Sequence, residues 1–270
     1  PNDRELGVSL AETLAAAGRL QPACTVFEGL IEAFGRKRTP ERAELHFRLA
    51  RVRKAAGEVP RAIEELDSAT KMDPSHVAAM HLLAQSCQEL GDLDRAERTY
   101  RGLLMLVRRQ KPGERQTLFQ SEVFYALSVI ANAHGQKQQA DELLESAMET
   151  ASQHDVEARR FQEVLRKHEQ LPLLMTLLDV REKLAQAPAE QAEILQTRAE
   201  VLSDMMGQPA EAFALLLRAL GLAPENDALH QRALGLAAGL GELDRYLQCL
   251  ATLSDEAARK RDQAGRRLAA

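Results

Sequence analysis

A set of glycines that recurs with a basic period of 34 residues constrains this chain more than any other feature. In the clearest example, Leu49-Ala50 precedes Gly57, and Ala62 and Leu66 follow it. The same gaps recur around three other glycines and similar gaps around two more, so the chain is built from internal repeats. The marker glycines are Gly18, Gly57, Gly91, Gly135, Gly207 and Gly241, and 34 residues separate Gly57 from Gly91 and Gly207 from Gly241.

Each position of the pattern has a physical role in a helix–turn–helix unit. Leu49-Ala50 places one large and one small residue on the packing face of a first helix. The glycine ends that helix, because a left-handed residue is needed there. Ala62 lets a second, antiparallel helix approach closely, and Leu66 fills the groove beside it. One such hairpin cannot bury its apolar face alone, whereas stacked neighbours can.

The longer gaps between markers contain insertions and one atypical unit. The gap from Gly91 to Gly135 predicts extra chain at about residues 104–120, with a second helix extended to about Gln110 and a turn at Lys111-Pro112-Gly113. A unit with Glu169 at the glycine position fits between Gly135 and Gly207. We therefore expect seven units that start near residues 4, 43, 77, 121, 155, 193 and 227, with residues 255–270 as the first helix of a further unit.

This pattern closely resembles the tetratricopeptide repeat family. The resemblance covers residues 4–254; it is most specific in Arg42–Pro74 and Val77–Leu103 and weakest around Glu169. It implies an all-α fold, a right-handed α-solenoid of about seven tandem repeats that forms one superhelical domain over residues 1–270. It also implies that partners bind on the concave surface lined by the first helices.

The charge, cysteine content and hydropathy of the chain disfavour several classes of function. The net charge of −5 argues against bulk phosphate binding, which needs clustered Lys and Arg. Cys24, Cys87 and Cys249 lie far apart and indicate free thiols in a reducing, cytoplasmic compartment. No run of 18 apolar residues predicts a membrane span. High Ala, Leu and Arg usage is typical of a GC-rich bacterial source, and we interpret the chain as an excerpt of a longer protein.

We find no motif that predicts catalysis, a cofactor or a metal. The sequence has no phosphate-binding G-x-x-x-x-G-K loop and no G-x-S-x-G. The histidines are scattered, with no His-x-x-x-His and no Cys-x-x-Cys spacing. We therefore expect a non-catalytic protein without a small-molecule substrate.

The predicted partner-binding residues are those on the first helices that the Leu-Ala packing face does not use. They are Phe47, Arg51 and Lys54, then His81, Gln85 and Gln88, then Tyr125, Val129 and Asn132. Phe47 and Tyr125 would serve as interface anchors, and the alternative is that both rings are core. The basic first helix that carries Arg51 could accept an acidic peptide or a C-terminal carboxylate. The alternative there is a solvated charged face beside Glu44 and Glu58.

Three functional hypotheses remain. The first is a protein-interaction scaffold that binds a partner peptide or helix in the groove, centred on residues 44–132. The second is a regulatory or targeting arm of a larger enzyme. The third is weak nucleic-acid binding, which the negative net charge disfavours; its candidate basic runs are Arg36-Lys37-Arg38, Arg108-Arg109-Lys111 and Arg259-Lys260-Arg261.

The atypical unit gives a prediction about local stability. Because the unit around Glu169 lacks three of the pattern's residues, its neighbour packing should be weaker. Amide hydrogen exchange measured by mass spectrometry should be faster there than over Leu83–Leu103. Uniform protection of the two segments would contradict the prediction.

Overall fold

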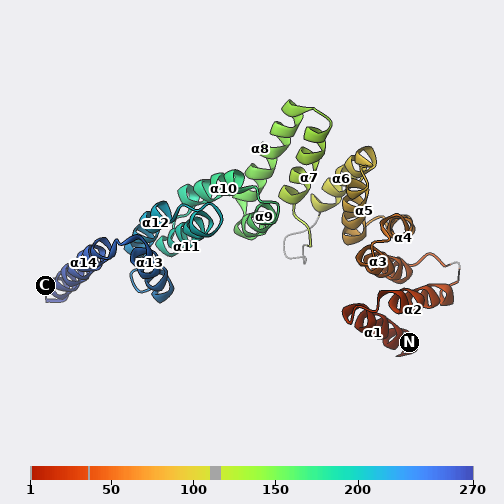
Figure 1. Cartoon of the computed structure of the whole chain (residues 1–270), viewed down its shortest axis with the longest axis horizontal. Coiled ribbons are helices and arrows are strands. Elements are labelled where there is room, and N and C mark those ends of the chain that lie inside the picture. Colours follow the sequence, from red (N-terminus) through yellow and green to blue (C-terminus); the bar gives the residue numbers. More distant parts are fainter. Residues whose placement is uncertain (1, 36, 110–116, 270) are drawn as a thin grey trace. The chain divides into compact units, whose positions relative to one another are not determined.

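The first of two compact units, Pro1–Ala151, consists of helices in consecutive antiparallel pairs (Figure 1). The computed structural model describes residues 2–35, 37–109 and 117–269, and the side chains of 4–35, 37–109 and 117–259. The helices are α1 (Asn2–Ala16), α2 (Leu20–Ala33), α3 (Pro40–Ala55), α4 (Val59–Met72), α5 (Val77–Glu89), α6 (Leu93–Val107), α7 (Gln120–Ala133) and α8 (Lys137–Gln153), the last of which ends just beyond the unit.

The second compact unit, Ser152–Ala270, continues the same pattern of paired helices. Its helices are α9 (Asp155–Lys167), α10 (Leu171–Leu184), α11 (Pro188–Glu200) with the π-helical turn η1 (Val201–Met205), α12 (Pro209–Leu222), α13 (Asp227–Leu240) and α14 (Leu243–Ala269). Over the described residues the chain is all-α, with fourteen α-helices in seven successive pairs. The α-solenoid class predicted from the repeats is thereby confirmed.

Some predicted boundaries were wrong. The unit expected to start near residue 193 begins at Pro188, because proline is well suited to the first turn of a helix. α6 ends at Val107, before the expected Gln110. Residues 255–269 continue α14 and do not start a new helix, because neither glycine nor proline interrupts Leu253–Arg259. Arg36, Gln110 and the turn predicted at Lys111-Pro112-Gly113 lie outside the described residues.

The turns between paired helices confirm the repeat register. All six marker glycines have positive φ, from 66° at Gly207 to 79° at Gly57 and Gly91. Glu169, at the seventh marker position, also has a positive φ of 54°. The Glu169 N–H donates to the Arg166 carbonyl at 3.1 Å, and Gly57 bonds to Lys54 in the same way at 3.0 Å. The atypical unit therefore makes the same turn without the residue that adopts it most easily.

The residues predicted to pack each hairpin are buried. Ala62, Ala96 and Ala212 are each 0% exposed, and so are Leu66 and Leu216, which follow at helical spacing. A small residue thus lies where the two helices of a pair meet, and a large one fills the adjoining space. These side chains belong to two clusters, one in each compact unit.

The turn η1 absorbs one extra residue in the sixth pair. Eight residues separate the buried Ala199 from Gly207, whereas seven separate the buried Ala50 from Gly57. The Met206 N–H consequently donates to the Val201 carbonyl, five residues back, at 3.1 Å. A π-helical turn of this kind accommodates an insertion without moving the packing face.

Replacing Ala62 tests the closest approach of α3 and α4. Because the side chain is completely buried, Ala62→Leu should overpack the hairpin and cost roughly 1–3 kcal/mol of unfolding free energy. Thermal and urea unfolding followed by circular dichroism would measure the loss. The exposed Ala55 provides the matched control, since Ala55→Leu should change stability little, and equal losses in the two variants would contradict the register.

Replacing Glu169 tests the backbone conformation of the atypical turn. A left-handed non-glycine residue costs about 1 kcal/mol, so Glu169→Gly should slow hydrogen exchange in α9 and α10 by a few-fold. Glu169→Ala removes the same charge but keeps the unfavourable conformation. It should therefore give no comparable protection, and equal effects of the two variants would assign the result to charge.

Candidate functional site

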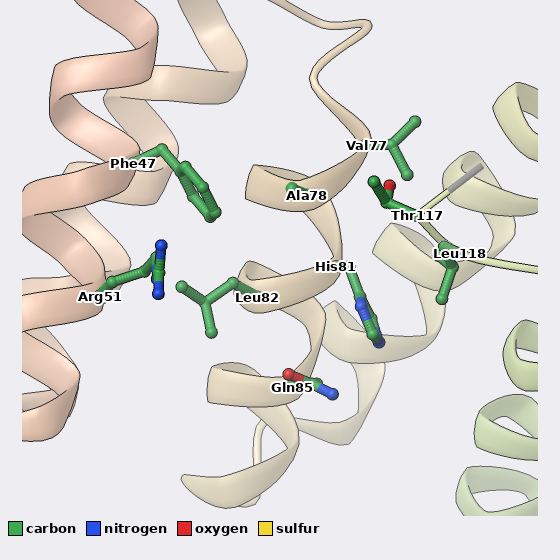
Figure 2. A pocket seen from close by; sticks show the side chains of 9 residues that line it. All are labelled: Phe47, Arg51, Val77, Ala78, His81, Leu82, Gln85, Thr117 and Leu118. Carbon is green, nitrogen blue, oxygen red and sulfur yellow. The ribbon is translucent and has the colours of Figure 1, made fainter. Parts of the chain in front are cut away.

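A pocket of about 220 Å³ lies on the exposed face of α5 (Figure 2). Phe47 and Arg51 of α3 line one side, and Thr117 and Leu118, which precede α7, line another. Between them, the floor consists of α5 residues at helical spacing, namely Val77, Ala78, His81, Leu82 and Gln85. The pocket is therefore built from two successive first helices and the end of the insertion.

The α3 side of the pocket combines an aromatic ring with a cation. The Phe47 ring is half-buried and packs against the His76 ring, with 4.9 Å between centroids. The Arg51 guanidinium lies 5.9 Å from the centroid of the Phe47 ring. Such a cation–π contact holds the cation beside an apolar surface without neutralising it.

The other basic side chains of α3 are mostly engaged by carboxylates. Arg48 pairs with Glu12 at 2.5 Å, and Lys54 pairs with Glu89 at 2.7 Å. Arg53 contacts Glu28 at 2.6 Å and Glu65 at 2.9 Å, while Arg42 donates to the Lys37 carbonyl at 3.4 Å. Among the residues that the structure describes, Arg51 has no carboxylate within ion-pair distance, although it is exposed.

The carboxylate of Glu44 pairs with basic side chains of its own repeat and of the next one. Its carboxylate accepts from Arg48 at 2.6 Å and lies 2.9 Å from the His76 ring. The hydrogen bond with His76, followed by the contact with Arg48, lowers the pKa of Glu44 despite its partial burial. Glu44 is thus ionised at neutral pH and belongs to a local network beside the pocket.

The structure brings four of the nine predicted partner-binding residues into this pocket: Phe47, Arg51, His81 and Gln85. Lys54 is engaged by Glu89, and Gln88 is half-buried outside the lining. Val129 and Asn132 are exposed on α7 but do not line the pocket.

Tyr125 was expected on the exposed groove, but it is buried. Its side chain is 8% exposed, and burial raises the pKa of its hydroxyl. The alternative considered from the sequence, a core position, describes its location. Phe47 is both a core residue and a candidate interface anchor, because it packs against the core and also lines the pocket.

Five lining residues were not anticipated. Ala78 lies one turn before His81 on the same face, so extending the predicted stripe backward would have found it. Thr117 and Leu118 follow the insertion, and no periodic pattern marks them. Leu118 is 1% exposed and packs in the core.

Other functional classes find little support in the described residues. They contain no group of three or more His, Cys, Asp or Glu side chains that could hold a metal ion. Cys24 and Cys87 are buried free thiols, and burial raises the pKa of each, which disfavours the reactive thiolate. No described helix combines the length and apolar character needed to cross a membrane.

Comparison with known proteins gives one family match and several similar solved structures. Residues 47–115 match the tetratricopeptide repeat family, and no curated protein matches the chain. A tetratricopeptide repeat protein from Parabacteroides merdae is 13% identical, with a TM-score of 0.50 over 94% of this chain and 93% of that one. A putative kinesin light chain with nearly identical TPR-like repeats from Podosopora anserina is 20% identical, with a TM-score of 0.46 over 81% and 94% of the two chains.

The family match includes the pocket's lining residues on α3 and α5 but ends before Thr117, and the likeness to the Parabacteroides structure extends the fold over almost the whole chain. The paired helices, the left-handed turns and the buried small residues are those that the repeat pattern predicts. Residues 47–115 are similar to the tetratricopeptide repeat family, and the whole chain shares its fold with a protein built from such repeats.

Proposed function

We propose that this chain binds a peptide or helix of a partner protein on the exposed face of its first helices, within residues 44–132. A tetratricopeptide repeat fold supports a general role as a protein-interaction scaffold. The finer assignment to this face is supported by the pocket across α5, which joins Phe47 and Arg51 to Ala78, Leu82 and Gln85. An apolar floor with a few polar groups is the usual composition of a recognition site.

The role of this scaffold in a larger assembly is a second part of the proposal. A regulatory or targeting arm of a larger enzyme would bind its partner on the same face. The pocket therefore fits an independent scaffold and an enzyme's arm equally well. Nucleic-acid binding finds less support, because the net charge is −5 and the three candidate basic runs lie far apart in the sequence. The free thiols favour a reducing compartment, and we infer the cytoplasm.

Affinity capture from native lysate, read by mass spectrometry, tests the proposed face. Wild type is compared with a Phe47→Ala, Arg51→Glu variant, which removes one apolar ring and reverses one charge in the pocket. A partner that wild type captures should be lost by this variant. Circular dichroism must show unchanged helicity, since Phe47 also packs against the core.

The chain offers a matched control on a second helix. Met105 and Arg98 are both exposed on α6 and line no part of the pocket. Met105→Ala, Arg98→Glu therefore makes the same kinds of change elsewhere and should retain the partner. A partner kept by both variants would move the interface off this face, and capture of no partner would contradict the scaffold itself.

A further inference from the structure

We infer that the pocket across α5 recognises an internal acidic–apolar motif, in which one bulky apolar side chain enters the pocket and a neighbouring Asp or Glu pairs with Arg51. This inference rests on the proposed function and specifies the chemistry of the partner. It follows from three features of the pocket: its unmatched charge, its size and its apolar floor.

The charge of the pocket is positive and unmatched. None of the nine lining residues is acidic, and Arg51 is their permanent cation. On the same helix, Arg48, Arg53 and Lys54 are neutralised by carboxylates from other helices, whereas Arg51 has no ion pair among the described residues and lies over the face of Phe47. A guanidinium binds one carboxylate through two parallel hydrogen bonds, so a partner carboxylate completes an arrangement that the chain leaves open.

The size and lining of the pocket favour a side chain over a small molecule. Its volume of about 220 Å³ is below the roughly 300–1,000 Å³ of typical small-molecule sites. Val77, Ala78, Leu82 and Leu118 provide apolar surface, and the Phe47 ring adds an aromatic side. Burial of an apolar side chain there would supply binding free energy, and the Arg51 pair would add orientation.

The number of available cations distinguishes an internal motif from a chain terminus. Lys54 lies one turn after Arg51 but is engaged by Glu89 at 2.7 Å. An acidic motif at the end of a partner would bring its terminal carboxylate as a second anion, and the described lining residues include no second permanent cation. One guanidinium therefore matches one side-chain carboxylate within a continuing segment.

Selection of random short peptides with amidated C-termini on the full chain tests this inference. We expect enriched sequences to share a bulky apolar residue with Asp or Glu within one helical turn of it. Replacing that acid with Gln or Asn should weaken binding to wild type about tenfold, as for the loss of a charge-assisted hydrogen bond. In an Arg51→Glu variant the same replacement should instead strengthen binding, because it removes the repulsion between two carboxylates, and a peptide with Lys in place of the acid should bind this variant.

Controls separate this inference from the proposed function. Arg98→Glu reverses an exposed charge on α6 and should select the same sequences as wild type. Peptides that bind wild type, are lost with Phe47→Ala and are indifferent to Arg51→Glu would overturn the acidic motif but keep the proposed face. Enrichment only in a parallel library with free C-termini would overturn the internal motif. If no peptide depends on either residue, both proposals fail.

Discussion

The close approach of two antiparallel helices at a buried small residue is the constraint on which each regular repeat depends. Ala62, Ala96 and Ala212 leave no exposed surface, so their helices meet with no room for a larger side chain. A left-handed residue then reverses the chain between the helices. In the last pair, Tyr246 takes the position of the small residue. Its side chain makes contacts that a small residue could not make, and its hydroxyl lies 3.0 Å from His230 Nδ1.

The repeat register could be predicted because it is set by short-range requirements. A turn that needs positive φ selects glycine, and the spacing placed Glu169 at the glycine position of the atypical unit, where the structure also has a left-handed residue. Helix ends were harder to predict, because the pattern marks the middle of each hairpin. Pro188 extends α11 toward its N-terminus, and the uninterrupted run after Leu253 extends α14, neither of which the packing positions encode.

The candidate site could be predicted only in part, because basic side chains of one repeat form ion pairs with acidic side chains of the neighbouring repeats. Arg48 pairs with Glu12 and Lys54 pairs with Glu89, each about one repeat away in the sequence. Such pairs, when exposed, contribute only about 0–1 kcal/mol each to stability. Their larger consequence is that α3 presents an exposed cation, Arg51, with no carboxylate partner among the described residues, which no count along a single helix can identify.

The residues that follow the insertion contribute to the pocket. Thr117 and Leu118 lie between the insertion and α7 and line the pocket on the α5 face. Leu118 is also part of the buried cluster with Leu83, Tyr100 and Leu103. Because one side chain belongs to both the lining and the core, the packing that stabilises the α5–α6 hairpin also fixes the pocket's wall. Recognition there would use a surface that is already ordered, which lowers the entropic cost of binding a flexible segment.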